Sequence, residues 1–204
     1  NENLSEIKWF WPAPKRFIFE DMQNYGYEKK IIFPITATVK TTKEPLVLQA
    51  NITALACKDI CVPIDGDLNL TIPVGNPVKT EHAASIYSFE KRVPTKANWP
   101  GFKILSVNAN KNSILIKVKS KHPLIKPDVF IESENGFRFG KPEVSFSNNR
   151  LNASFILSND IPIDTNLAGI PIIITVVDGK KSIEVRRSIR GKLVTKPVQS
   201  YTSF

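Results

Sequence analysis

The 204-residue sequence has little glycine, histidine, cysteine and methionine, with nine, two, two and one of these residues. So few glycines leave little room for phosphate-binding loops, and neither G-x-S-x-G nor H-E-x-x-H occurs. No apolar run approaches the roughly 18 residues of a spanning helix, and the longest, residues 168–177, has the length of a strand. These absences argue against common hydrolase, nucleotide-binding and membrane-spanning proteins.

Positive charge is in excess, with 28 Lys and Arg against 19 Asp and Glu and a net charge of +9. The basic residues occur singly or in pairs, as in Lys29-Lys30 and Arg186-Arg187, and no nucleic-acid motif with interleaved aromatics accompanies them. We therefore attribute the charge to solubility and expect neither a nucleic-acid partner nor direct membrane insertion. Because the chain begins at Asn1 rather than Met, we expect a processed or trimmed product.

Alternating apolar and polar residues dominate the rest of the chain. Residues 29–40, 45–55 and 66–74 predict short strands bounded by Pro, Gly or charged turns. After residue 101 the alternation resumes in FKILSVNAN, SILIKVKS, DVFIES, EVSFS, RLNASFIL, PIIITVV and SIEVRRSIRG. The DGKK sequence at 178–181 predicts a hairpin turn, because Asp-Gly tolerates the positive φ of tight hairpins. Strands at this spacing without intervening helices indicate antiparallel sandwiches.

The alternation breaks at residues 76–101, where Ala83, Ile86 and Phe89 follow a helical spacing. Thr80 is a suitable N-cap for a short helix there, and Pro94 stops it. This segment predicts a helix-containing linker between two β domains, residues 1–94 and 95–204. We expect Asp65 and Asp67 to lie in a turn between strands, because too few spaced oxygen ligands follow for a calcium site.

Both cysteines fall in ALACKDICVP, residues 54–63. Fully extended, residues 57–61 would hold their Cα atoms about 13 Å apart, whereas a disulfide needs less than about 7 Å, so a paired state requires a turn at KDI. Three interpretations remain: buried apolar thiols, a structural bridge and a redox-active pair. A bridge closing so short a loop would contribute only about 2 kcal/mol, which makes a purely structural role a weak explanation.

A metal site is the main alternative. Zinc usually requires four ligands, and the only histidines, His82 and His122, lie in different predicted segments. Two thiolates can satisfy Cu(I), and the C-x3-C spacing is similar to that of Sco-type copper-delivery proteins, although Val62 here precedes the proline. Copper binding by Cys57 and Cys61, or a non-catalytic interaction module, are the competing hypotheses.

WPAPKRF at 11–17, YGYEKKIIFPI at 25–35 and ALACKDICVPIDGDLNLTIPV at 54–74 together resemble the periplasmic N-terminal region of the DsbD/ScsB family of thiol:disulfide interchange proteins. The resemblance implies an immunoglobulin-like sandwich in which Cys57 and Cys61 form the redox pair. It implies electron transfer from a membrane-embedded reductase segment to periplasmic thioredoxin-like or other disulfide-bearing proteins, without a cofactor. The second half is similar only in being another β domain, so we expect two immunoglobulin-like sandwiches in the periplasm.

Members of the DsbD branch shield the cysteine pair with an aromatic-bearing cap loop. By resemblance, Tyr27, Tyr25, Trp9 or Trp11 are candidates for this role, with Tyr27 favoured. We expect Cys61 to be the attacking thiol, because Lys58 and the turn should bury Cys57.

Overall fold

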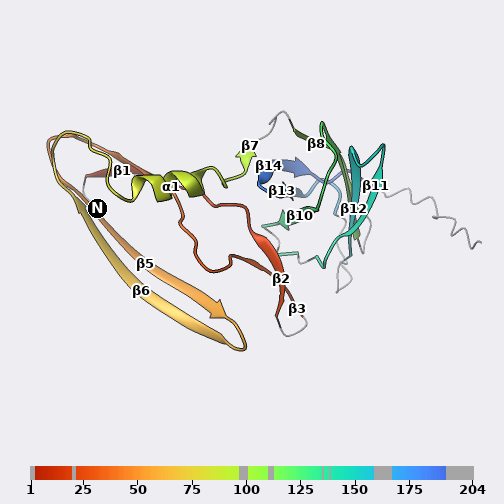
Figure 1. Ribbon diagram of the computed structural model, residues 1–204, viewed down its shortest axis with the longest axis horizontal. Coiled ribbons are helices and arrows are strands. Elements are labelled where there is room, and N and C mark those ends of the chain that lie inside the picture. Colours follow the sequence, from red (N-terminus) through yellow and green to blue (C-terminus); the bar gives the residue numbers. More distant parts are fainter. Residues whose placement is uncertain are drawn as a thin grey trace, which may run out of the picture. The chain divides into compact units, whose positions relative to one another are not determined.

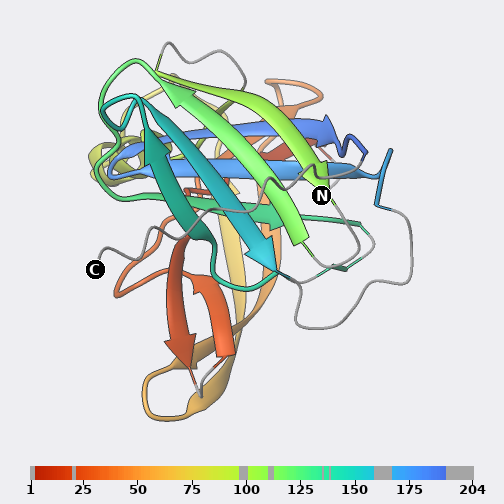
Figure 2. The same cartoon turned by 90° about the vertical axis from the view of Figure 1, so that its right-hand side faces the viewer.

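The computed structural model describes residues 3–19, 22–96, 101–109, 113–134, 136–137, 139–158 and 167–191 (Figure 1). The chain divides into two compact units, Asn1–Val93 and Pro94–Phe204. Strands dominate both units, and one helix occurs among the described residues (Figures 1 and 2). The prediction of an all-β, immunoglobulin-like protein is confirmed. The assignment of separate roles to the two parts stays a prediction.

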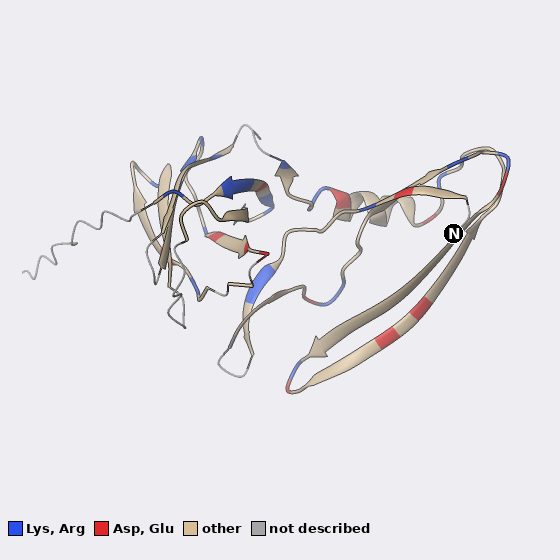
Figure 3. Ribbon diagram, turned by 180° about the vertical axis from the view of Figure 1, so that it is seen from behind, with Lys and Arg blue, Asp and Glu red and all other residues tan. Residues whose placement is uncertain are grey.

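Strands of the first unit pair in twos. β1 is antiparallel to β4, β2 to β3 and β5 to β6, and each pair forms its own two-stranded sheet. The β5–β6 pair is a long ribbon, and Figure 3 shows acidic bands along β6 and charges at its loop. The element bounds are β1 Leu4–Trp9, β2 Lys15–Phe19, β3 Met22–Gly26, β4 Ile35–Val39, β5 Leu46–Cys57, β6 Cys61–Ile72 and α1 Ala83–Glu90.

The strand predicted over residues 29–40 is shorter than expected, since only Ile35–Val39 pairs as β4. Lys29 has a positive φ of 64°, which is incompatible with the extended backbone of a strand. Pro34 lacks the N–H group that a paired strand residue needs. The carbonyl of Pro34 instead accepts a hydrogen bond from the Phe10 N–H, which follows β1, at 2.9 Å. Residues 30–34 therefore lie outside any strand, between the bend at Lys29 and the start of β4.

The N-cap of helix α1 lies two residues after the predicted one. His82 is the N-cap residue and makes no side-chain capping bond, while Thr80 contributes its backbone carbonyl to the Ala83 N–H at 3.0 Å. The prediction that Thr80 caps the helix is therefore wrong. None of the helices in the described part of the chain has the length and apolar character needed to cross a membrane.

Asn3, just before β1, is hydrogen-bonded to the segment between β4 and β5. Its side-chain amide donates to the carbonyls of Thr41, Glu44 and Pro45 at 3.0, 2.9 and 3.3 Å, and its oxygen accepts from the Thr41 N–H at 3.0 Å. Asn3 is buried, at 6% exposure, and both its side-chain nitrogen and its side-chain oxygen are hydrogen-bonded. This polar contact substitutes for apolar packing where the first unit buries little else.

The second unit is a sandwich of two four-stranded sheets. One sheet has the order β10-β13-β14-β7 and the other β11-β12-β9-β8, and all pairs are antiparallel except β14 with β7. The bounds are β7 Thr95–Lys96, β8 Phe102–Ala109, β9 Ser113–Ser120, β10 Pro127–Glu132, β11 Glu143–Ser147, β12 Asn152–Ser158, β13 Pro171–Asp178 and β14 Lys181–Ser188.

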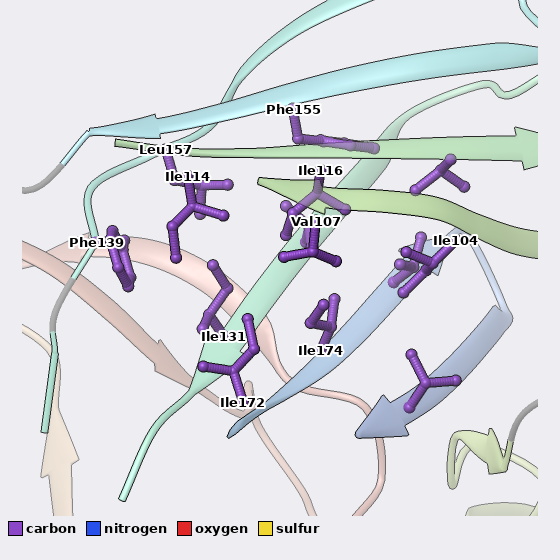
Figure 4. Close-up of a cluster of buried hydrophobic side chains, with 14 of the residues drawn as sticks. Ile104, Val107, Ile114, Ile116, Ile131, Phe139, Phe155, Leu157, Ile172 and Ile174 are labelled. Carbon is purple, nitrogen blue, oxygen red and sulfur yellow. The ribbon is translucent and has the colours of Figure 1, made fainter. Parts of the chain in front are cut away.

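The alternation in these strands places one set of side chains between the sheets (Figure 4). On β9, Ile114, Ile116 and Val118 have no exposed surface, and Phe155 of β12 is equally buried. Ile174 of β13 lies in the same cluster from the opposite sheet. Each such side chain contributes about 1.5–3 kcal/mol by leaving water, so the second unit has an apolar core of its own.

The predicted hairpin turn at residues 178–181 is present. Asp178 pairs with Lys181 across the turn, and Gly179 has a φ of 63°. The Asp178 carboxylate accepts the backbone N–H groups of Ile125 and Lys126, which ties this turn to the start of β10.

Candidate functional site

The cysteines close the end of the β5–β6 ribbon. β5 and β6 each contain 12 residues and pair in unbroken register from Leu46 with Ile72 to Cys57 with Cys61. Lys58, Asp59 and Ile60 make the connection, in which the Lys58 N–H donates to the Ile60 carbonyl at 3.1 Å. The sulfurs of Cys57 and Cys61 are joined at 2.02 Å, with their Cα atoms 4.0 Å apart. The tight turn that pairing required is therefore present.

Pro63 explains why the cross-strand pair Cys57–Cys61, which we call a rung of the ribbon, can hold a disulfide. Proline cannot donate a backbone hydrogen bond, so its rung with Leu55 must be of the class that exchanges none. The two classes alternate along an antiparallel pair, which places the Cys57–Cys61 rung, two residues on, in the same class. In that class the strands approach most closely and opposite side chains lie nearest each other. The ribbon register itself thus presents the two sulfurs to each other.

The disulfide lies on the polar face of the ribbon. On this face Asn51 donates to the Asp67 carboxylate at 2.8 Å, and the Thr53 hydroxyl donates to Asp65, also at 2.8 Å. Asp65 and Asp67 are therefore in the middle of β6, and the prediction that they form a turn is wrong. Their cross-strand hydrogen bonds fix the register that brings the cysteines together.

Both cysteines are exposed, and a cation and an anion lie side by side in the turn between them. Lys58 Nζ lies 3.7 Å from the Asp59 carboxylate, with both side chains largely in solvent. The expectation that Lys58 and the turn bury Cys57 is wrong, because Cys57 is exposed, as is Cys61. The choice of Cys61 as the attacking thiol stays a prediction. An open depression lies at the end of the ribbon beside Cys57, and its lining comes from the ribbon alone: Ala56, Cys57, Lys58, Asp59, Ile60 and Val62.

Two of the aromatic residues considered as a shield, Trp11 and Tyr27, lie against Phe33. The Trp11 and Phe33 ring centroids are 4.7 Å apart, and Tyr27 meets Phe33 edge-on at 5.4 Å while its hydroxyl donates to the Pro12 carbonyl at 2.8 Å. None of them lines the depression at the disulfide. The structure brings Trp11 and Tyr27 together through Phe33, and a shielding role stays a prediction.

The other two aromatic candidates have different neighbours. Tyr25 lies beneath the Arg16 guanidinium, 4.8 Å from its ring centroid, and Trp9 ends β1 opposite Ile35. Within the described ranges, no three His, Cys, Asp or Glu side chains are grouped so that they could hold a metal ion. His82 precedes α1 and His122 follows β9, so the two histidines belong to different units.

Comparison with known proteins agrees with this geometry. Residues 1–73, which include the whole β5–β6 ribbon, match the family model described as "Thiol:disulfide interchange protein DsbD, N-terminal". The first unit carries a DsbD-type N-terminal domain. The resemblance predicted from the sequence is thereby confirmed. Residues 92–192 match a family described as a domain of unknown function, DUF8393.

The fold of the chain also resembles a solved structure. The crystal structure of the N-terminal periplasmic domain of ScsB from Proteus mirabilis superposes with a TM-score of 0.73 at 19% sequence identity. The match covers 92% of this chain and 74% of that one. No curated protein sequence matches the chain.

Proposed function

We propose that the protein is a thiol-disulfide oxidoreductase in which Cys57 and Cys61 alternate between dithiol and disulfide. The observation that carries the proposal is an exposed disulfide on the last rung of a hairpin, in the segment that matches the DsbD N-terminal family. A bridge placed for stability would be buried or would close a long loop, whereas this one closes a loop of about five residues and faces solvent.

The exchange proceeds in two balanced steps. The thiolate of one reduced cysteine attacks a sulfur of the partner's disulfide, which forms a mixed disulfide and releases one partner thiolate. The second cysteine loses its proton and attacks the first, which reforms the Cys57–Cys61 bond and releases the other partner thiolate. The partner gains two electrons and its two thiolates take up two protons, while the pair in this protein is oxidised. A dithiol reductant then reverses both steps on the Cys57–Cys61 disulfide.

The surroundings of the pair favour regulation by docking rather than by a strongly activated thiolate. The lining of the depression comes from the ribbon alone and includes no helix N-terminus. The Lys58 cation would favour a thiolate, but Asp59 at 3.7 Å opposes that effect. The rate of exchange should therefore depend on how a partner positions its disulfide against Leu55 and Pro63, the rung that lies next to the cysteines on the same face of the ribbon.

The direction of electron flow follows the family match. In this proposal a membrane-embedded DsbD/ScsB-type segment supplies the dithiol, and periplasmic thioredoxin-like or other disulfide-bearing proteins receive the electrons. The bacterial periplasm is the compartment in which such a pair has oxidised partners to reduce.

The deciding experiment is the reduction potential of the pair. The protein is equilibrated against graded glutathione and dithiothreitol, and alkylated thiols are counted by intact mass, with Cys57→Ser/Cys61→Ser as the blank. A reversible couple well above about −300 mV supports exchange, and about 30 mV corresponds to a tenfold change in the equilibrium constant. A bridge that resists reduction in the folded protein contradicts the proposal.

Trapping of the mixed disulfide identifies the attacking thiol. Cys57→Ser and Cys61→Ser are each incubated with a disulfide-bonded thioredoxin-like protein. The variant that keeps the attacking cysteine accumulates the mixed disulfide, because no second thiol resolves it. If neither variant forms an adduct while the reduced protein retains stoichiometric Cu(I) on desalting, the copper-binding alternative replaces exchange.

A further inference from the structure

The face of the ribbon opposite the disulfide is entirely apolar. β5 and β6 pair so that even-numbered residues share one side. We call this side the aliphatic face. It consists of Leu46, Leu48, Ala50, Ile52, Ala54, Ala56, Val62, Ile64, Gly66, Leu68, Leu70 and Ile72.

Most of the aliphatic face is uncovered. Leu46, at the base of the ribbon, is 5% exposed, but Ile64 and Leu68 farther out are 52% and 57% exposed. An isolated two-stranded ribbon is marginally stable in water, and contiguous apolar patches of this kind mark interaction surfaces. The face carries no charge, so an occupant must be apolar and uncharged as well.

The sizes of the side chains indicate which occupant fits. In the four rungs nearest the disulfide, every pair combines a small residue with a large one. These rungs are Ala50 with Leu68, Ile52 with Gly66, Ala54 with Ile64 and Ala56 with Val62. Consider a second ribbon related to the first by a two-fold axis that runs between the two ribbons, parallel to their strands. The β6 strand of the second copy then lies over β5 of the first, with each rung opposite the same rung of the other copy. Each large side chain of one copy then faces a small side chain of the other.

From this pattern we infer that two copies of the chain associate through their aliphatic faces. The alternative two-fold axis, across the strands, places Ala50 over Ala56 and Leu68 over Val62 when the same uncovered rungs are superposed. At these two contacts that arrangement leaves a void on β5 and crowds β6, at the cost that interior packing imposes for both defects, and only its inner contacts, Ile52 over Ala54 and Ile64 over Gly66, combine a large residue with a small one. The axis along the ribbon is thus the complementary one, and it is isologous as a two-fold dimer requires.

The area predicts a reversible dimer. A two-stranded ribbon is about 10 Å wide and rises about 3.4 Å per residue, so covering the face of its 12-residue strands removes on the order of 400 Å² from each copy. The total of about 800 Å² lies in the range of small, transient interfaces. Asp65 and Asp67 point away from the contact, on the polar face with the disulfide. Both disulfides of the dimer therefore lie at the same end and stay accessible to redox partners.

A matched pair of charge substitutions tests the association. Leu68→Glu places a carboxylate in the aliphatic face, and Asn69→Glu places the same charge one residue away on the polar face. In sedimentation velocity from about 1 µM to 1 mM, we expect the unsubstituted chain and Asn69→Glu to dimerise. Leu68→Glu should weaken dimerisation at least about tenfold, because a buried carboxylate is costly. A protein that stays monomeric, or dimers that tolerate Leu68→Glu, overturn the inference.

Crosslinking tests the orientation in a Cys57→Ser/Cys61→Ser background. With Val62→Cys, a short bismaleimide should join two copies, because the ribbon ends lie together. A mixture of Val62→Cys and Ile72→Cys chains should give no mixed product, since the two positions are about 33 Å apart along the ribbon. A mixed product without the Val62→Cys homodimer would overturn the proposed axis. The reduction potential of Leu68→Glu should equal that of the unsubstituted protein, so the dimer and the redox proposal can fail separately.

Discussion

The same alternation of residues has opposite outcomes in the two units. On β9 the apolar positions Ile114, Ile116 and Val118 are fully buried between two four-stranded sheets, whereas on β5 and β6 Ile52 and Leu70 are 41% and 56% exposed. The sequence patterns of these strands are equally regular. Alternation thus determines which side chains share a face, but a second sheet has to be present before that face is buried. The second unit has this partner sheet, and the ribbon of the first does not.

The largest expected effect on stability comes from truncating a side chain in the core of the second unit. Phe155→Ala removes a side chain with no exposed surface and should lower the free energy of unfolding of the second unit by about 3–5 kcal/mol. Leu70→Ala, on the uncovered face, should cost less than about 1 kcal/mol, because little apolar surface returns to water. Chemical denaturation at low protein concentration measures both. Equal losses would show that the ribbon is as well packed as the sandwich.

A smaller effect is expected from the polar contact of Asn3. Asn3→Ala leaves the Thr41 N–H and three carbonyls without their partner and should destabilise the first unit by about 1–3 kcal/mol. Hydrogen exchange should show faster opening of residues 40–45 only. Ser88→Ala, which removes an exposed hydroxyl bonded within α1, is the control. If exchange in the second unit accelerates as well, the effect is not local to this contact.

Reduction of the disulfide should cost about 2 kcal/mol or less, because it opens a loop of about five residues. The remaining rungs of the ribbon, and the hydrogen bonds of Asp65 and Asp67, still set its register. Calorimetry of oxidised and reduced protein measures the difference, with Cys57→Ser/Cys61→Ser as the permanently open control. A loss of several kcal/mol would assign the bridge a structural role.

The smallest effect concerns pH in the second unit. Burial raises the pKa of Glu132, and the nearby Glu184 raises it further. A carboxyl group whose pKa is raised on folding destabilises the folded state once it is ionised. This cost is absent below the ordinary pKa of about 4.5 and grows as the pH rises from there through the raised pKa. Glu132→Gln should therefore raise Tm at about pH 7 and leave it unchanged at about pH 3.5. A higher Tm at both pH values would indicate better packing rather than removal of a charge.

Much of the second unit could be predicted from periodicity because its strands are short, regular and bounded by turn residues. SILIKVKS and EVSFS coincide with β9 and β11, and DGKK forms the predicted hairpin. In the first unit the prediction failed where local chemistry competes with alternation. Lys29 adopts a positive φ within an apparently regular strand, and Asp65 and Asp67 join a strand because Thr53 and Asn51 bind them across it.

Arg150 shows a contact that sequence patterns cannot reveal. Asn148, Asn149 and Arg150 all have φ near 50–64° in the turn between β11 and β12. The Arg150 side chain compensates for this conformation by donating to the carbonyls of Leu124 and Ile125 at 2.6 and 2.8 Å. Its partners lie 25 residues or more away in the chain. For the candidate site, by contrast, the C-x3-C spacing predicted the tight turn that pairing requires, because the whole arrangement is local.

The unbroken pairing of β5 with β6 has a kinetic consequence for a mixed disulfide. When one cysteine is bound to a partner, the other remains opposite it, held by the neighbouring rungs rather than by the bond just broken. Reacting groups held in this way reach effective molarities of about 10⁵ M or more when well aligned. Resolution should then outpace any thiol arriving from solution, so the complex with a partner releases quickly without an external reductant.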